Sequence, residues 1–217
     1  MIIVDIETTK FFDHPDVARL PRKKQLDALP FGLAVTYDSE NDEHILWNGE
    51  VVAHSLWEYL LKSNQVVGGW NIIRFDIPII QRAAAMFPGF DPGLTSPAVL
   101  DLFDRIIIHT GRWYPLGFIA EVNGLGSKLA DGKQASQWLN SGDPALIQRC
   151  AEYCKNDVDL TWRLYELART TGIYLPARPG RKHPETENFR IWIDGERWRL
   201  LDEDSGNDFR EAWDVNS

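Results

Sequence analysis

The chain opens with "MIIVDIETT" at residues 1–9, where branched apolar residues lead into Asp5 and Glu7 follows two positions later. This run predicts a β-strand whose side chains alternate between two faces. One face is then wholly apolar, whereas the other carries both Asp5 and Glu7. A nearly continuous apolar run is typical of a strand covered on both sides. Two like charges on such a strand lose solvation and repel each other unless something positive offsets them.

A bound metal ion would supply that positive charge. Carboxylate oxygens are hard ligands and suit Mg²⁺ or Mn²⁺. The alternative is a strand end that emerges into water, where both carboxylates would be hydrated. The strand alone leaves both interpretations open, so the rest of the chain has to decide between them.

Composition and charge narrow the class of protein. The chain has 217 residues, 44% of them hydrophobic and 25% charged, which is typical of a globular protein with one good-sized core. A formal charge of −9 argues against a large basic face that grips long duplexes, but metal-binding carboxylates would themselves add negative charge. Cys150 and Cys154 lie four residues apart, as half-buried small hydrophobes would in one helix. Cysteines of this kind fit a reducing, cytoplasmic setting, and no stretch approaches the ~20 apolar residues of a membrane span.

Periodicity predicts alternating strands and helices in the first 172 residues. Strand patterns occupy 2–7, 32–37, 43–48 and 65–70, and helical patterns occupy 54–63, 77–87 and 115–122. The clearest helix begins after the N-cap residue Asp143 with Pro144 and ends before Gly172. Apolar residues repeat along it at three- and four-residue spacing, and Asp157 lies within or beside that stripe. A carboxylate there is costly unless something pairs with it.

The remaining residues, 173–217, form a segment of different composition. A Pro- and Arg-rich connector contains Arg178, Arg181 and Lys182, and "FRIWIDGERWRL" at 189–200 predicts a β-hairpin. We expect the acidic end that follows to be solvated or disordered. The hairpin either offers Trp192 and Trp198 with nearby arginines to a nucleic-acid strand, or covers a patch of core. Two domains are therefore predicted, at 1–172 and 173–217.

Further polar residues lie where strands end. Asp76, in "GGWNIIRFDIP", follows a predicted strand and opens a helix, a position typical of an ordinary N-cap. Asp101, in "VLDLFD", is either a supporting acid or a helix cap. The dense basic run of Arg19, Arg22, Lys23 and Lys24 either steers a nucleic-acid strand or is a solvated loop.

In combination these motifs are more specific. D-x-E on the first strand, N-x-x-x-F-D about seventy residues later and Y-x-x-x-D on a late helix resemble, in that order, the DEDD superfamily of 3′–5′ exonucleases. The last motif resembles the Tyr-containing (DEDDy) branch, found in proofreading domains of family B DNA polymerases and in small stand-alone exonucleases. The His-containing branch has His five residues before the last Asp, where this chain has Glu152. The resemblance covers 1–172 except an insertion at 11–30, and implies an α/β, ribonuclease-H-like mixed sheet flanked by helices.

The resemblance also implies an activity. The protein would remove nucleotides from the 3′ end of nucleic acid, with single-stranded DNA favoured, as 5′-nucleoside monophosphates, using two Mg²⁺ or Mn²⁺ ions. It assigns metal binding to Asp5, Glu7, Asp76 and Asp157. It assigns orientation of the attacking water to Tyr153. Contacts with the terminal nucleotide are expected from Thr8, Asn71 and Phe75.

Other functions of the same fold stay open. An RNA exonuclease or a structure-specific endonuclease would keep the chemistry and change the substrate. A non-catalytic module that binds nucleic acid is a different class, but such a module has no reason to retain buried like charges. The sequence does not choose between DNA and RNA, or say whether a polymerase or another replication or repair protein is a partner.

Overall fold

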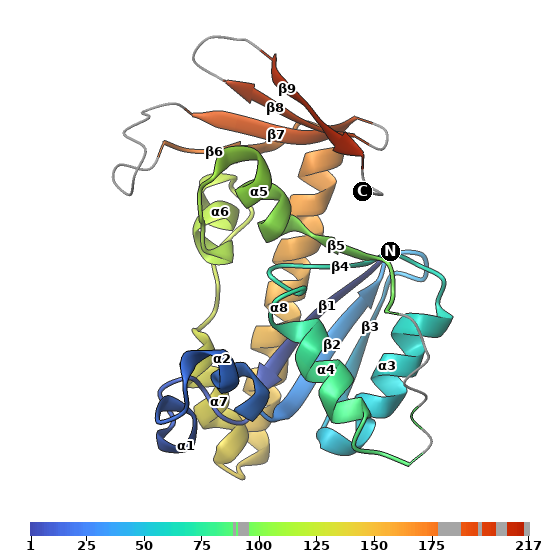
Figure 1. Cartoon of the computed structure of the whole chain (residues 1–217), viewed down its shortest axis with the longest axis vertical. Coiled ribbons are helices and arrows are strands. Elements are labelled where there is room, and N and C mark those ends of the chain that lie inside the picture. The colour runs from blue at the N-terminus through green and yellow to red at the C-terminus, as the bar shows by residue number, and fades with distance from the viewer. Residues whose placement is uncertain (89, 91–95, 178–187, 195–196, 203–207, 215–217) are drawn as a thin grey trace. The chain divides into compact units, whose positions relative to one another are not determined.

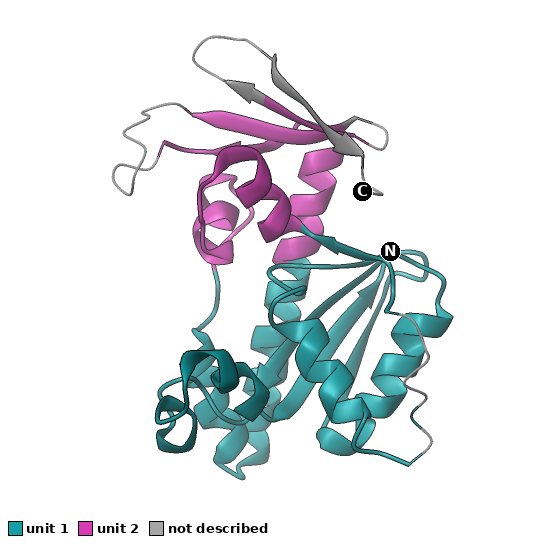
Figure 2. Cartoon of the chain, in the orientation of Figure 1, with its two compact units in different colours: residues 1–101, 128–159 teal, residues 102–127, 160–217 magenta. Residues whose placement is uncertain are grey.

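The computed structural model describes residues 1–88, 90, 96–177, 188–194, 197–202 and 208–214. Its contacts divide the chain into two compact units (Figure 2). Unit 1 contains residues 1–101 and 128–159, and unit 2 contains residues 102–127 and 160–217. The predicted domain boundary at residue 172 divides a proposed catalytic module from a tail. The two compact units are a different kind of division and do not test that boundary, so it stays a prediction. None of the helices in the described ranges is long and apolar enough to span a bilayer.

Unit 1 is built on a mixed sheet of five strands in the order β3-β2-β1-β4-β5 (Figure 1). The strands are β1 (Ile2–Thr8), β2 (Phe31–Asp38), β3 (Glu43–Asn48), β4 (Val67–Gly69) and β5 (Val99–Asp101). β1 is antiparallel to β2 and parallel to β4. β2 and β3 form an antiparallel hairpin, and β4 and β5 run parallel. The stretch that opens the chain is therefore the central strand of the sheet.

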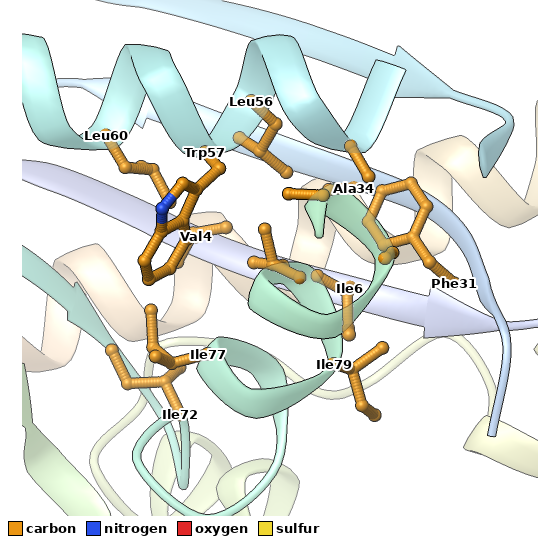
Figure 3. Close-up of a cluster of buried hydrophobic side chains, with 14 of the residues drawn as sticks. Val4, Ile6, Phe31, Ala34, Leu56, Trp57, Leu60, Ile72, Ile77 and Ile79 are labelled. Atoms are coloured by element: carbon orange, nitrogen blue, oxygen red, sulfur yellow. The ribbon is translucent and has the colours of Figure 1, made fainter. Parts of the chain in front are cut away.

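Helices flank this sheet, as predicted. Those of unit 1 include α3 (Ala53–Lys62), α4 (Asp76–Ala84), α7 (Gly132–Asn140) and the first part of α8 (Pro144–Arg169). α3 and α4 cover the apolar face of β1, where Figure 3 shows Val4 and Ile6 packed among side chains such as Trp57 and Ile79. α8 contacts the opposite face, since the Cys154 thiol is hydrogen-bonded to Asp5. β1 is thus covered on both sides, as its sequence indicates.

The ends of α8 confirm the predicted capping residues. The Asp143 carboxylate accepts a hydrogen bond from the backbone N–H of Ala145 at 2.9 Å, just ahead of Pro144 as the first helical residue. At the other end, Gly172 has φ +83° and donates to the Leu167 carbonyl at 2.7 Å. The helix that carries Asp157 therefore begins and ends where local sequence signals place it.

Several short elements were not predicted. α1 (Pro15–Ala18), α2 (Arg22–Gln25) and the 3₁₀ turns Leu26–Ala28 and Glu50–Val52 are too short to show a helical period. α7 is longer, but it is polar, and it begins after Asp131, whose carboxylate accepts from Gln134 N–H at 2.8 Å. α4 ends at Ala84, before the predicted limit of 87, and β4 occupies only residues 67–69 of the predicted 65–70.

Unit 2 combines helices with a second sheet. It contains α5 (Leu102–Thr110), α6 (Leu116–Val122), the end of α8, and strands β6 (Ile173–Leu175), β7 (Phe189–Asp194), β8 (Arg197–Asp202) and β9 (Asp208–Asp214). The strand order is β6-β7-β8-β9, and β7 and β8 form the predicted hairpin. The acidic end is not disordered throughout, because residues 208–214 form β9, which pairs with β8. Whether its side chains are solvated stays a prediction.

The hairpin has two unlike faces. Ile191, Trp198 and Leu200 are buried on one face. Trp192 is paired with Arg199 on the other face. Trp198 is therefore not available to stack with a nucleic-acid strand, and within unit 2 the hairpin covers apolar core. Strand binding by Trp192 and the nearby arginines stays a prediction. The connector's Arg178, Arg181 and Lys182 lie outside the described residues.

These two tryptophans give a direct test of the hairpin's structural role. Trp198→Ala removes a side chain that is 0% exposed, so we expect a loss of about 3–5 kcal/mol in the free energy of unfolding. Trp192→Ala removes a half-buried ring from the other face and should cost clearly less. Urea denaturation followed by circular dichroism measures both. Equal losses in the two variants would contradict the assignment of faces.

Candidate metal centre

Carboxylates meet near the carboxyl end of β1. Asp5 and Glu7 come from one face of the strand, and Asp157 comes from α8. Each offers an oxygen atom, and the three atoms all lie within 4.8 Å of one another. Glu7 and Asp157 are only 7% and 2% exposed. The structure thus brings together three of the four acids that the sequence marks as metal ligands.

Cys154 holds part of this cluster in place. Its Sγ lies 3.2 Å from the backbone oxygen of Asp5 and 3.3 Å from Asp5 Oδ2, so the thiol can donate to either atom. The sequence predicted a half-buried small hydrophobe, whereas Cys154 is free and fully buried. No local pattern could reveal the contact, because Cys154 and Asp5 are far apart in the sequence.

Asp76 faces the same strand from the first residue of α4. Its Oδ1 accepts a hydrogen bond from the backbone N–H of Ile6 at 3.0 Å, and Ile6 lies between Asp5 and Glu7 in the sequence. The Asp76 side chain is 2% exposed. It is not one of the three carboxylates that share the 4.8 Å group, but it lies close enough to Asp5 for the two charges to repel. The fourth predicted acid therefore lies beside the cluster.

The loop that precedes α4 is held by Asp101. This carboxylate accepts from the backbone N–H of Asn71 at 2.8 Å and of Ile73 at 3.1 Å, so Asp101 is a supporting acid. Asn71 has φ +65°. The loop also returns very close to Gly69, the last residue of β4: a Cβ on Gly69 would lie 2.1 Å from Ile72 Cγ2 in the loop and 2.9 Å from the Val4 carbonyl of β1. Only glycine allows this approach.

Tyr153 and Lys128 both contact Asp157. Tyr153 lies one helical turn earlier on α8, is 2% exposed, and is hydrogen-bonded to Asp157 through its hydroxyl. Lys128, in the loop before α7, has its Nζ 2.5 Å from Asp157 Oδ2 and 5.1 Å from the centre of the Tyr153 ring. The position of Tyr153 agrees with the sequence spacing. Lys128 was not predicted, because a single lysine in a Gly- and Ser-rich loop carries no signal of its own.

Among the contacts described, the predicted substrate-binding residues form no hydrogen bond to the four predicted metal ligands, although the Asn71 amide is bonded to Asp101. The hydroxyl of Thr8 donates to the Lys10 carbonyl at 2.6 Å, which stabilises the turn after β1. Phe75 is half-buried and packs against the core, and Asn71 is half-buried in its loop. Their role in substrate binding stays a prediction.

Burial and mutual repulsion dominate the electrostatics of the cluster. Burial, followed by the charge of Asp157, raises the pKa of Asp5 to about 7. Burial first and Asp5 next hold the pKa values of Glu7 and Asp76 well above their usual range. Burial also raises the pKa of Asp157, although Lys128 opposes that shift. Burial alone would lower the pKa of Lys128, but the carboxylates, Asp157 first, raise it.

The donor set fits a hard divalent cation. Three carboxylates within reach of a single ion carry more negative charge than the one ammonium of Lys128 can balance. Oxygen ligands of this kind are those that Mg²⁺ and Mn²⁺ prefer. The cluster of Asp5, Glu7 and Asp157 could therefore bind a metal ion, and binding would remove the repulsion that raises their pKa values.

The raised pKa of Asp5 predicts a pH dependence in metal-free protein. The group titrates near 3.8 in its ordinary state and at about 7 in the folded protein, so folding favours the protonated form. Ionisation therefore costs stability as pH rises from about 4 to about 7. Asp5→Asn removes this cost. In EDTA, the free energy of unfolding of the variant relative to wild type should increase over that range, by a few kcal/mol at most.

Asp16→Asn is the matched control for this experiment. The hydrogen bond and charge of Lys10 lower the pKa of Asp16, so its contribution to stability is lost as pH falls and has the opposite sign. Chemical denaturation at a series of pH values measures all three proteins. Parallel stability profiles for Asp5→Asn and wild type would show that Asp5 is ionised without penalty.

The chain is similar to solved structures, of which two are described here, and to one family model. An exonuclease I structure is 12% identical with a TM-score of 0.40, covering 93% of this chain and 54% of that one. E. coli exonuclease I in complex with a 5cy-dT13 oligonucleotide is 13% identical with a TM-score of 0.38, covering 93% and 53%. The chain thus spans about half the length of both proteins. A search of curated proteins gives no match. The model of the RNase H superfamily matches residues 2–169, so the chain belongs to that superfamily.

Proposed function

We propose that the protein is a metal-dependent 3′–5′ exonuclease. It would hydrolyse phosphodiester bonds at the 3′ end of single-stranded DNA and release 5′-nucleoside monophosphates. The observation that carries the proposal is the group of half-buried Asp5 with buried Glu7 and Asp157, with the Tyr153 hydroxyl bonded to Asp157. Membership of the RNase H superfamily supports a nuclease. The polarity and the product rest on the resemblance of the motifs to those of DEDD exonucleases.

The acids would hold two divalent cations. When bound, Mg²⁺ or Mn²⁺ would lower the pKa of water and neutralise charge on the leaving oxygen. Asp5, Glu7 and Asp157 are grouped as ligands, and Asp76 would contribute from beside them. These acids would come from three elements: Asp5 and Glu7 from β1, Asp76 from α4 and Asp157 from α8.

Tyr153 would act as a positioning hydroxyl and not as a base. Burial and the charge of Asp157 raise its pKa above the ordinary value of 10.0, so the hydroxyl keeps its proton at neutral pH. A protonated phenol can donate to Asp157 and still accept a hydrogen bond from a water molecule. The Trp138 ring packs edge to face against the Tyr153 ring, with 6.5 Å between the ring centres. This contact would restrict the direction of the Tyr153 hydroxyl. Tyr153 would therefore orient the water that attacks phosphorus.

Lys128 would balance charge in the same place. The carboxylates keep its ammonium protonated, and it lies 2.5 Å from Asp157 Oδ2. One positive charge lowers the repulsion among the acids before cations bind.

Digestion of labelled oligonucleotides tests the activity. Single-stranded DNA and RNA of one sequence, labelled at the 5′ end, are incubated with Mg²⁺ or Mn²⁺. A ladder that shortens with time is expected from DNA, and faster digestion of RNA would reassign the substrate. Asp157→Ala should abolish cleavage, because it removes a ligand and leaves Lys128 without its partner. More than about a tenth of the wild-type rate in Asp157→Ala would rule out the assignment of Asp157.

The role of the Tyr153 hydroxyl is tested separately. Tyr153→Phe keeps the ring and its packing, so the melting temperature should change little. The rate should fall by about 10- to 1000-fold, the usual effect of one positioned polar group in a transition state. Tyr165→Phe, on the same helix but in unit 2, is the control and should keep the wild-type rate. If both variants cleave at the same rate, Tyr153 is only a core aromatic.

A further inference from the structure

We infer that residues 10–25, here called the basic arm, bind the single strand upstream of the nucleotide that is removed. The arm follows β1 directly and contains α1 and α2 (Figure 1). It coincides with most of the insertion at 11–30, which lies outside the motifs shared with DEDD exonucleases. The inference rests on the proposed function, and it assigns a binding surface that those motifs do not contain.

The first observation concerns the positive charges of the arm. In the arm, Lys10 and Arg19 both form ion pairs with Asp16, at 3.0 and 3.1 Å. Arg22, Lys23 and Lys24, which lie in α2, are exposed, and no carboxylate among the described residues pairs with them. In a chain of net charge −9, three consecutive unneutralised cations on one turn are a local positive surface. Phosphates are the complementary ligand.

The second observation is that the arm is anchored to the core. Val17 in α1 and Leu29 just beyond α2 are 0% and 1% exposed and belong to the core cluster of unit 1. The Arg82 guanidinium of α4 donates to the Leu29 carbonyl at 2.5 Å and lies 3.9 Å from the Asp27 carboxylate. The cations of α2 are therefore displayed from a fixed base. Binding a strand there costs less ordering entropy than binding it on a loose loop.

The third observation connects the arm to the metal centre through aromatic rings. Phe12 is 38% exposed, and its ring centre lies 6.2 Å from that of Phe75 and 5.6 Å from that of Phe11. Phe75 immediately precedes Asp76, whose carboxylate is bonded to β1. An exposed ring at this position can stack with a nucleobase. A strand leaving the cluster of acids would thus meet Phe12 and then the phosphate-binding cations of α2.

Binding and cleavage are measured separately to test this inference. Affinity for 5′-fluorescein-labelled dT12 is followed by fluorescence anisotropy in EDTA, where no cleavage occurs, at several salt concentrations. The arm variant is R22Q/K23Q/K24Q, and its control is K62Q/R163Q/R169Q, which removes three exposed cations from other helices. The arm variant should bind more weakly. The slope of its log affinity against log salt should become less steep, with its magnitude reduced by about 2, as expected for three lost phosphate contacts. The control should keep the wild-type slope.

The aromatic contact has an equally close control. Phe118 is 37% exposed and its ring lies 6.2 Å from that of Tyr114, so Phe118→Ala matches Phe12→Ala in exposure and ring spacing. Phe12→Ala should weaken dT12 binding by about 5- to 100-fold without changing the salt slope, the worth of one stacked base. Phe118→Ala should have no such effect.

The arm variant R22Q/K23Q/K24Q is also tested by kinetics. With Mn²⁺, it should raise KM for dT12 and leave cleavage of a dinucleotide unchanged.

The outcomes separate the two hypotheses. Wild-type protein that binds dT12 through the arm but does not shorten it would overturn the proposed exonuclease and retain the arm. Wild-type protein that shortens dT12, with affinity and salt slope alike in the arm variant and its control, would overturn the arm and show a solvated surface. Similar losses in Phe12→Ala and Phe118→Ala would overturn the stacking contact.

Discussion

The repulsion among carboxylates buried against β1 is the constraint on which the rest of the site depends. Asp5, Glu7 and Asp157 converge within 4.8 Å, and solvent is largely excluded from Glu7 and Asp157. Such an arrangement is unfavourable in the absence of a cation, so the surrounding structure has to hold it. It does so with backbone geometry: one strand sets two acids, and one helix sets the third.

The second motif shows how this geometry spreads outward. Asp76 is attached to β1 by a hydrogen bond to the Ile6 amide, and the loop leading to Asp76 is attached to Asp101 through two further backbone amides. Asp76 and Asp101 are therefore both held by hydrogen bonds from main-chain amides. Because backbone amides move only with their elements, the relative positions of β1, β5 and α4 are coupled to the position of the acid.

Much of this could be read from local periodicity. Alternation along β1 places Asp5 and Glu7 on one face, and helical spacing places Tyr153 beside Asp157; both depend only on residues close in sequence. The family resemblance supplied the rest of the predicted ligand set and the ribonuclease-H-like fold. Asp76 was ambiguous for a physical reason: an acid at the start of a helix can cap that helix or face a neighbouring strand, and the sequence is the same in both cases.

Contacts between distant segments could not be predicted. Lys128 and Cys154 each touch an acid, yet one lies in a loop without periodicity and the other looks like any buried cysteine of a helix. α1 and α2 are shorter than the period that would identify them, and α7 buries only a few residues of a polar sequence. β9 was missed because a count of acidic residues describes side chains, whereas strand pairing uses the backbone. In each case the deciding information lies in the partner segment.

Gly69 has a consequence for how this sequence can evolve. It has no side chain, yet any side chain at this position would collide with Ile72 and with the main chain of β1. Substitution there would push the loop away from the strand and carry Asp76 with it. In a library of random variants selected for activity, position 69 should therefore tolerate as few replacements as the acids themselves. Intolerance to mutation would then identify a residue that takes no part in the chemistry, and only the structure distinguishes the two causes.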